Sequence, residues 1–578
     1  MAIFALRLLR GLSGVGFGWA TLTLGLPVAF AQPAEPPIRP VGPEPPNELP
    51  DEPLPLLPPP DQLIPSLSLP TPPTVPANPD EQATFYIAGV DIVGNTALAD
   101  DEFADLVAPY VGQQISFSDL LALRTAITDR YVERGFVTSG AFIPPQTVEA
   151  DIVKIQVIEG EIEEIVVRGQ HRLSEAYVRS RIGLSAQPPI NVDTLLAGLQ
   201  RLQNDPLIET ISADLQAGVR PGTSLLVIDI TEADSLAVAT EVSNSRSPNI
   251  GGAERQFSIS EGNLLGLGDR LALDYSNTDG SNGLDLSYTL PVSPNNDSLR
   301  FSAGLSHSEV IDSIFSVLEI SSDSHYYELS YRHPLIESPT EELAMGLTLS
   351  YQESQTRLGI DDIGPFPLSP GANSDGITRV STLRFFQEWT ERSPKHVLAL
   401  RSQFNLGVDW FGATDNDSAP DSEFFAWRGQ GQWVQLIGRD TLFFLKGSAQ
   451  LAADDLLSQE AFGLGGHSSV RGYRQDALLR DNGAALSAEL RLPVARVPEM
   501  EGLLQVTPFV DVGAAWNYRD DPPGPNVLAG LGLGLLWQQG DRFSARLDWG
   551  IPLVDLPDDG SDSWQDNGLY FSIQFTPF

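Results

Sequence analysis

Apolar and polar residues alternate in short segments through the carboxyl-terminal part of the chain. In one segment Leu299 and Phe301 alternate with Arg300 and Ser302. This spacing places the two kinds of side chain on opposite faces of a β-strand. Clusters of Asn, Asp, Gly and Pro separate about sixteen such segments, which predicts antiparallel strands joined by turns and loops.

Residues 235–578 are therefore predicted to form a transmembrane antiparallel β-barrel of about 16 strands. A membrane-crossing strand uses roughly 9–11 residues, so about sixteen fit and leave the rest for loops. A soluble β-sandwich or propeller is the alternative. The barrel is favoured because each strand has only one apolar face, and because tryptophans cluster near strand ends, as in interfacial girdles. These are Trp389, Trp410, Trp427, Trp433, Trp537, Trp549 and Trp564.

A mixed helix and strand pattern precedes the barrel and occurs twice, in residues 84–159 and 160–234. Each copy has the order β-α-α-β-β, with a period of about 75 residues and low residue identity between copies. The first should contain strands at 85–93, 137–143 and 151–158 and helices at 100–110 and 116–134. The second should contain strands at 161–168, 208–217 and 224–231 and helices at 174–182 and 192–202.

The amino-terminal region has two parts. Residues 1–31 combine Arg7 and Arg10, an apolar stretch and a terminal Ala29-Phe-Ala31, which is typical of a secretory signal peptide. A single anchor helix is the alternative. Residues 32–83 are so rich in proline that we expect an extended spacer rather than a helix.

Composition limits the chemistry. The formal net charge is −41, which argues against a nucleic-acid partner because phosphate contacts need a basic face. Cysteine is absent, which excludes thiolate metal sites and cysteine nucleophiles. The six histidines form no metalloprotease spacing, and no phosphate-binding Gly-rich motif precedes a helix. We therefore expect neither an enzyme nor a bound metal or cofactor.

One connection between strands, residues 457–482, is unusually long. It contains a candidate glycine hinge formed by Gly463, Gly465 and Gly466. The hinge is followed by a motif formed by Val470, Arg471, Gly472 and Tyr473. Glycines allow a loop to bend sharply, and a cation can anchor a loop tip in a polar lumen. Alone, however, such a motif is more often a solvated loop tip.

A partner for this loop lies two strands further along the chain. Alternation places Phe509, Asp511 and Gly513 on one face of a strand whose other face is apolar. Valines towards lipid would direct the carboxylate of Asp511 into the lumen, opposite Arg471. In a wet lumen this pair would contribute about 1 kcal/mol, so it is predicted to be a positional latch.

Together these features resemble the TpsB transporters of two-partner secretion, which include the haemolysin secretion/activation proteins of the ShlB/FhaC/HecB type. The signal peptide, proline-rich spacer, two small domains, barrel and Val-Arg-Gly-Tyr loop all match, as does the Phe-x-Asp-x-Gly strand. TpsB proteins share a superfamily with the BamA barrel-assembly proteins. By this resemblance residues 32–83 would be a periplasmic or plug-linker segment, although their many prolines depart from the helical plug that is common in the family.

The resemblance implies a location and a function. The two small domains would be periplasmic POTRA domains, and the barrel would lie in the outer membrane among lipid and lipopolysaccharide. The loop would fold into the barrel, with Arg471 facing Asp511. The protein would pass an unfolded TpsA-like exoprotein, such as an adhesin or haemolysin, to the cell surface without ATP. A BamA-like insertase is the alternative, and a passive porin-like channel is a third.

Overall fold

The computed structural model describes residues 49–57, 66–68, 84–148, 150–313, 315–417, 420–519, 521–557 and 563–577. The predicted signal peptide and most of the proline-rich segment lie outside the described residues. Within the described ranges, no helix combines the length and apolar character needed to cross a bilayer.

The first small unit contains a three-stranded sheet of order β3-β6-β5 and a separate β2–β4 pair. Its strands are β2 (Thr84–Ile87), β3 (Gly89–Val93), β4 (Gln113–Ser116), β5 (Gly140–Phe142) and β6 (Ile152–Ile158). Helix α4 (Phe117–Glu133) packs on the sheet through Leu123 and Ile127, both fully buried. It begins where a capping box forms between Ser116 and Asp119, which satisfies the first free amides of the helix.

Three predictions for this unit were inaccurate. The expected strand at 85–93 is divided into β2 and β3, and the strand expected at 137–143 is only the three-residue β5. The helix expected at 100–110 is a 3-10 turn, η1 (Asp100–Phe103), followed by the short α3 (Ala104–Val107). Pro109 explains this early end, since proline has no backbone N–H with which to continue the hydrogen bonds of the helix.

The second small unit follows the predicted order closely. It contains β7 (Glu161–Arg168), α5 (Glu175–Gly183), α6 (Val192–Gln203), β8 (Ile208–Ala217) and β9 (Thr223–Glu232). The side-chain oxygen of Asn191 caps α6 by accepting hydrogen bonds from the backbone N–H groups of Asp193 and Thr194. The apolar faces of both helices pack on a sheet of order β8-β9-β7. A fourth strand, β1 (Ser66–Ser68), pairs with β8.

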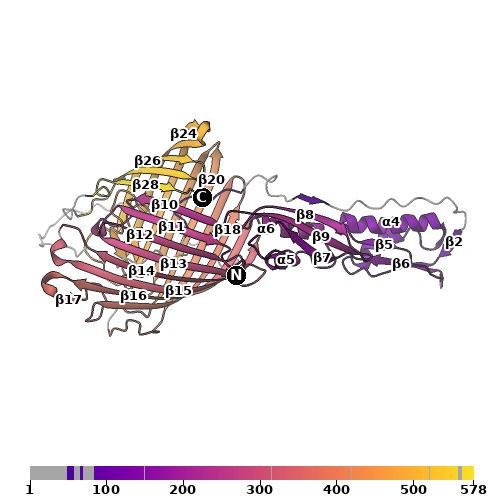
Figure 1. Cartoon of the computed structure of the whole chain (residues 1–578), viewed down its shortest axis with the longest axis horizontal. Coiled ribbons are helices and arrows are strands. Elements are labelled where there is room, and N and C mark those ends of the chain that lie inside the picture. The colour runs from indigo at the N-terminus through magenta and orange to yellow at the C-terminus, as the bar shows by residue number, and fades with distance from the viewer. Residues whose placement is uncertain are drawn as a thin grey trace, which may run out of the picture. The chain divides into compact units, whose positions relative to one another are not determined.

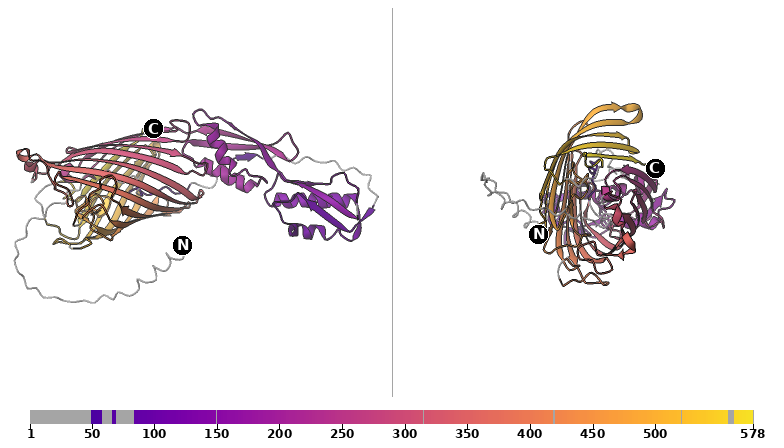
Figure 2. Two further views of the ribbon diagram at one scale, coloured as in Figure 1. Left: turned by 90° about the horizontal axis from the view of Figure 1, so that it is seen from below. Right: turned by 90° about the vertical axis from the view of Figure 1, so that its left-hand side faces the viewer.

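The remaining chain closes into the predicted antiparallel barrel (Figure 1). Sixteen strands form its wall, with the two-residue β17 (Gly364–Pro365) paired beside β16. Closure comes from the antiparallel pairing of the first wall strand, β10, with the last, β28. Figure 2 shows the strands curving round into this wall. The sixteen wall strands have the following bounds. They are β10 (Leu236–Ser243), β11 (Glu254–Gly262), β12 (Arg270–Asn277), β13 (Ser281–Pro291), β14 (Ser298–Glu309), β15 (Ile320–Glu337), β16 (Glu341–Leu358), β18 (Ile377–Arg392), β19 (His396–Gly407), β20 (Phe425–Gly438), β21 (Thr441–Ala452), β24 (Asn482–Val497), β25 (Gly502–Trp516), β26 (Val527–Gln539), β27 (Phe543–Pro552) and β28 (Leu569–Phe575).

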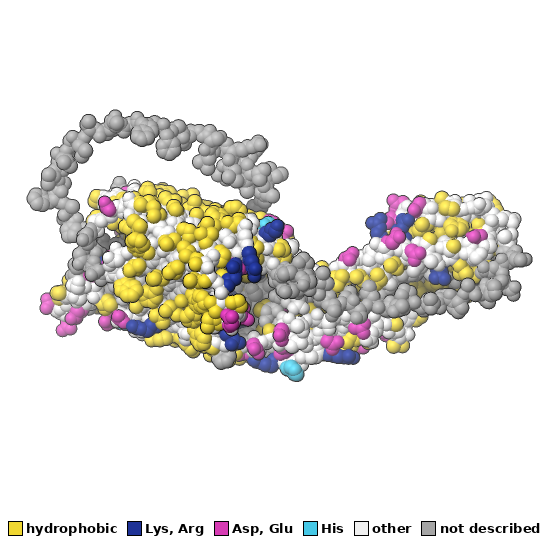
Figure 3. Space-filling model, turned by 90° about the horizontal axis from the view of Figure 1, so that it is seen from above, with side chains coloured by type: hydrophobic (Ala, Val, Ile, Leu, Met, Phe, Trp, Pro, Cys, Tyr) yellow, Lys and Arg dark blue, Asp and Glu magenta, His cyan; other side chains and the backbone are white. Residues whose placement is uncertain are grey.

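The two faces of the wall differ as the alternation predicts. Leu329 and Tyr331 on β15 are exposed on the outside, whereas Glu328 and Ser330, which alternate with them, are buried. Hydrophobic side chains gather over the barrel strands on the face drawn in Figure 3. An apolar exterior and a polar interior are what a barrel needs in a bilayer.

Candidate functional site

The long loop between β21 and β24 folds back on itself. Strands β22 (Phe462–Leu464) and β23 (Leu478–Arg480) form a two-stranded ribbon at its base. Gly463 belongs to β22, so it is part of the ribbon rather than a bend. Gly465 and Gly466 have φ angles of +112° and +96°, which residues with a side chain rarely adopt, and they turn the chain out of the ribbon.

Beyond this turn, Arg471 lies against Asp511 on β25. The guanidinium donates two hydrogen bonds to the carboxylate, at 2.8 Å from Nε and 3.0 Å from Nη2. The backbone N–H of Arg471 donates a third, at 3.1 Å. The planar guanidinium therefore meets the carboxylate in a bidentate arrangement, with its position further fixed by the main chain.

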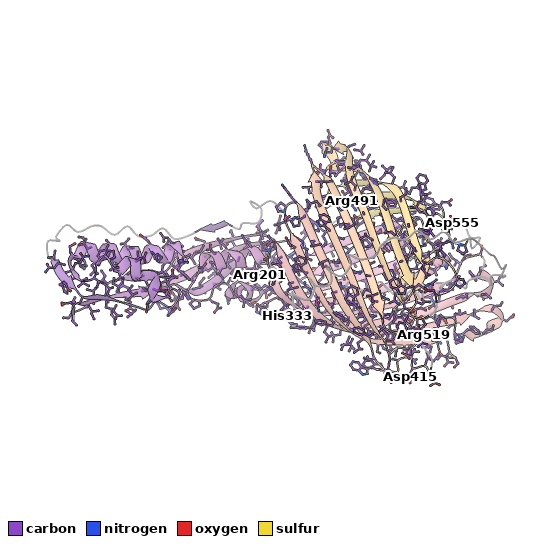
Figure 4. The ribbon with its side chains drawn as sticks, turned by 180° about the vertical axis from the view of Figure 1, so that it is seen from behind. Arg201, His333, Asp415, Arg491, Arg519 and Asp555 are labelled. Carbon is purple, nitrogen blue, oxygen red and sulfur yellow. The ribbon has the colours of Figure 1, made fainter. Side chains whose placement is uncertain are left out.

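Two more carboxylates and two more arginines extend this pair into a network. Arg471 Nη1 lies 2.9 Å from Glu489 on β24 and 3.2 Å from Asp548 on β27. Arg546 bonds both of these carboxylates. Arg491, labelled in Figure 4, bonds Glu489 at 3.0 Å. Three guanidinium groups thus face three wall carboxylates contributed by β24, β25 and β27.

The other two residues of the predicted strand motif also contact the loop. The guanidinium of Arg471 stacks on the ring of Phe509, 3.4 Å from its centroid, in cation–π geometry. A Cβ at Gly513 would come within 2.4 Å of Leu464. Phe509 therefore supports the guanidinium from one face, and Gly513 leaves space for the ribbon.

Glycines on β26 and β27 allow the loop to lie directly on the wall. A Cβ at Gly530 would be 2.1 Å from the carbonyl oxygen of Arg471. One at Gly550 would be 2.6 Å from the nitrogen of Gly472, and one at Gly472 would be 2.9 Å from the nitrogen of Pro552. Gly472 also has a φ of +106°. Backbone meets backbone here, so a larger residue at any of the three would displace the loop.

The rest of the motif is buried as well. Val470 and Tyr473 belong to an apolar cluster with Leu464 and Leu528. The hydroxyl of Tyr473 donates to the carbonyl of Ala529 at 2.8 Å. Every residue of the Val-Arg-Gly-Tyr motif therefore contacts the wall or the ribbon, which is not the arrangement of a solvated loop tip.

A second anchor holds the amino-terminal half of the loop. Glu460 pairs with Arg384 on β18 at 2.8 Å, and Arg384 also pairs with Glu328 on β15 at 3.1 Å. These side chains are largely buried. The loop is therefore held on two separated parts of the wall.

The site is drier than the sequence suggested. Arg471 is 4% exposed and Asp511 0% exposed, because the loop itself covers them. The estimate of about 1 kcal/mol for a pair in a wet lumen does not apply to this geometry. Removing one partner of a buried, hydrogen-bonded pair typically costs about 3–5 kcal/mol, since it leaves the other charge unpaired.

Several residues of the site were missing from the sequence-based prediction. They are Glu489, Arg491, Arg546, Asp548 and Tyr570. The available signal was a charge on the polar face of a predicted strand, as where Leu547 separates Arg546 from Asp548. That signal is weak, because barrel interiors contain many polar residues. As for metals, the described part of the chain holds no group of three or more histidine or acidic side chains arranged as ligands.

Comparison with known proteins places the chain in a family. The model of the haemolysin secretion/activation proteins ShlB/FhaC/HecB matches residues 222–536, and that of the ShlB-type POTRA domain matches residues 85–160. The outer membrane transporter CdiB of Escherichia coli O6:K15:H31 is 24% identical over 494 residues, covering 82% of this chain and 80% of its own. The heme/hemopexin transporter protein HuxB of Haemophilus influenzae is 24% identical over 441 residues, covering 74% and 75%.

Solved structures share the fold. CdiB from Escherichia coli superimposes with a TM-score of 0.64 at 22% identity, covering 89% of this chain and 95% of that one. BamA from Haemophilus ducreyi, lacking its first three POTRA domains, gives 0.51 at 16% identity, covering 85% and 100%. The chain belongs to the ShlB/FhaC/HecB family of haemolysin secretion/activation proteins, and it is an outer-membrane transporter of two-partner secretion.

Proposed function

We propose that this transporter captures an unfolded, TpsA-like exoprotein through its periplasmic domains and passes it through the barrel without ATP. Folding of the exoprotein outside the cell would make the transfer irreversible. In this proposal residues 1–31 are a signal peptide, 84–159 and 160–234 are two POTRA domains, and 235–578 are the barrel. The outward apolar rows of the barrel contact membrane lipid.

The observation that carries the capture step is a strand pairing in the second small unit. The chain's own β1 adds to the edge strand β8 in parallel, with residues 66–68 opposite 212–214. Strand addition of this kind uses backbone hydrogen bonds, so it tolerates many sequences. An unfolded exoprotein offers the same backbone groups, and the β8 edge could accept them in the same way.

The hydrogen-bonding groups of this edge can be assigned. The side chain of Gln203 accepts from the N–H of Ile211 at 3.1 Å and donates to the carbonyl of Glu209 at 3.0 Å. Ile211 therefore points its backbone groups away from β9, and alternation does the same for Ala213 and Leu215. Gln203 covers one end of the edge, and β1 covers the part around Ala213.

Replacing Ala213 with proline tests this proposal, because proline removes the edge N–H without touching the bonds to β9. Ala213→Val is the matched control, since it adds similar bulk and keeps the N–H. We expect Ala213→Pro to lower secretion of the exoprotein at least tenfold while Ala213→Val secretes within twofold of the parent. Equal secretion by both variants, at equal barrel levels in the membrane, would remove strand addition at β8 from the mechanism.

We further propose that the Arg471–Asp511 pair is the latch that holds the long loop in its closed position. The support is geometric: three hydrogen bonds join these two residues, and both are buried. The turn at Gly465 and Gly466 would let the loop shift when the latch opens.

A further inference from the structure

The described residues 49–57 of the proline-rich segment lie against the inside of the barrel. On β20, Gln432 is buried and its neighbour Trp433 is exposed on the outside. On β27, Arg546 is buried and its neighbour Leu547 is exposed. Since neighbours in a strand point to opposite faces, Gln432 and Arg546 point inward, and both contact the segment.

Gln432 holds the main chain of the segment. Its side-chain oxygen accepts from the N–H of Leu54 at 3.0 Å. Its side-chain nitrogen donates to the carbonyls of Pro50 at 2.9 Å and Glu52 at 3.0 Å. One amide therefore satisfies three backbone groups of an extended chain. Contacts of this kind do not depend on the side chains of the bound peptide.

Basic side chains on the wall hold the two acidic residues of the segment. Arg491 lies 2.6 Å from the carboxylate of Glu52, and Arg546 lies 3.3 Å from it. Lys446 pairs with Asp51. Arg491 and Arg546 are buried, whereas Glu52 is 57% exposed at its side chain. The wall thus presents fixed cations to carboxylates that remain in contact with solvent.

An apolar cluster takes the next part of the segment. Leu54 and Leu56 pack against Val397, Val434 and Phe444, which come from three adjacent strands, β19, β20 and β21. The prolines between and before these leucines keep the segment extended. The wall therefore binds a particular peptide pattern. Two acidic residues are followed by one further residue and then by two apolar residues at alternate positions.

The wall does not need the segment for its own charge balance. Without Glu52, Arg491 still bonds Glu489 at 3.0 Å and Arg546 still bonds Asp548 at 2.8 Å. The side chain of Glu52 is also 57% exposed, so it already contacts water while it is bound to the wall. These are the properties of a site that can be emptied and refilled rather than of a structural core.

We propose that Gln432, Arg491, Arg546 and the apolar cluster form a peptide-binding site in the lumen, the lumen peptide track. Its ligand is an extended polypeptide with an acidic pair followed by alternating apolar residues. The segment 49–57 occupies the track until a translocating exoprotein replaces it. This inference rests on the proposed function, and it adds a binding site inside the barrel that is separate from the β8 edge.

Binding can be measured on the full-length protein in detergent with residues 51–56 replaced by a Gly-Ser stretch of equal length. The probe is a fluorescein-labelled peptide of residues 49–57, followed by anisotropy. We expect saturable binding that weakens at least tenfold with Gln432→Leu, and at least tenfold when the acidic pair of the peptide is changed to Asn-Gln. Gln403→Leu is the matched control, an inward glutamine on β19 that bonds its neighbours Arg401 and Asn405, and it should stay within twofold. The track would be overturned if the labelled peptide bound the parent, Gln432→Leu and Gln403→Leu equally well and the altered peptide bound the parent with that same affinity.

A second measurement uses the intact chain, with Phe444 replaced by the photo-crosslinking analogue benzoylphenylalanine. At rest it should crosslink within the chain, to residues 49–57. During secretion it should crosslink to the exoprotein instead. Secretion that proceeds with only the internal crosslink would overturn the track and leave the transport function standing. Loss of secretion in Ala213→Pro together with normal peptide binding would concern the β8 edge alone.

Discussion

Asp511 accepts three hydrogen bonds from Arg471 of the long loop. Asparagine has nearly the same shape as aspartate, so the charge of Asp511 can be tested separately from its shape. Asp511→Asn keeps the shape and removes the charge that Arg471 faces. We expect it to lower secretion at least tenfold and to destabilise the closed loop by about 3 kcal/mol, because a buried guanidinium loses part of its compensation. Exoprotein secretion and heat-modifiable gel mobility measure the two effects. Asp541→Asn, on an exposed turn, is the control and should secrete normally.

Arg471 tests whether charge alone is enough. Lysine keeps the charge, but its ammonium cannot form the fork-shaped contact with Asp511 or stack as a plane on Phe509. We therefore expect Arg471→Lys to secrete at least tenfold less exoprotein than the parent while the barrel still assembles. Normal secretion by this variant would mean that the latch needs only a positive charge at this position.

Glu159 provides a pH-dependent test in the first small unit. Burial favours its neutral form, but hydrogen bonds from the amides of Ala97 and Thr96 outweigh this effect and hold the pKa of Glu159 below its usual value. The carboxylate therefore stabilises the fold above its unfolded pKa of about 4.3, and this contribution is lost as the pH falls through the lower folded value. Glu159→Gln should destabilise the unit by about 1–3 kcal/mol at pH 7.

Hydrogen exchange of the α4 amides in the full-length protein measures this effect. The difference between parent and Glu159→Gln should be largest at pH 7 and should shrink towards pH 4 and below. Asp91→Asn, an exposed carboxylate on β3, should exchange like the parent at every pH. A difference that grows on acidification would contradict the assigned direction of the pKa.

At the scale of elements, the two small units share one structural feature, a carboxylate that binds the backbone amides of a turn. Glu159 follows the last strand of the first unit and binds the amides of Thr96 and Ala97. Glu232 ends the last strand of the second unit and binds the amides of residues 171–173. In both units a carboxylate closes the turn after the first strand of the repeat. The shared feature supports the inference that the two units are copies of one fold.

The close contact between the long loop and strands β26 and β27 leads to a prediction about packing. A Cβ at Gly530 would clash with the carbonyl of Arg471, so Gly530→Ala should displace the loop at a cost of about 1–3 kcal/mol. The displaced loop should be cleaved by trypsin after Arg474 or Arg480 several times faster than in the parent. At Gly447 the nearest atom is 3.4 Å away, so Gly447→Ala is the control and should resist cleavage like the parent.

Local signals predicted the elements with different success. The prediction for the second unit was nearly complete, because Asn191 marks the start of α6 and because Gly169 and Gly222 mark turns with positive φ. The loop motif and Asp511 were also singled out. Glu489 and Asp548 were not, because their place beside Arg471 depends on strand register and barrel closure. Those features join residues 18 and 77 positions apart, and no local pattern encodes them.

At the scale of the whole molecule, the barrel depends on the difference between its two faces. Leu329, near the middle of β15, and Ile336, near its end, are both exposed on the outer face. They share this face because a β-bulge between Pro334 and Ile336 shifts the register by one residue. A charge facing lipid costs most at the bilayer centre and little at the interface. The two positions on one strand therefore separate burial in lipid from any effect on the lumen.

We expect Leu329→Arg to destabilise the folded barrel by about 2–4 kcal/mol and Ile336→Arg by only about 0–1 kcal/mol. Urea unfolding in lipid vesicles, followed by tryptophan fluorescence, measures both values. The order follows from depth alone, since the substitution is the same and both side chains face outward. Equal costs at the two sites, or a larger cost at Ile336, would contradict the placement of this strand across the bilayer. Because the placement of the barrel in the membrane rests on this difference between faces, such a result would also undermine the lumen in which Arg471, Asp511 and the peptide track are placed.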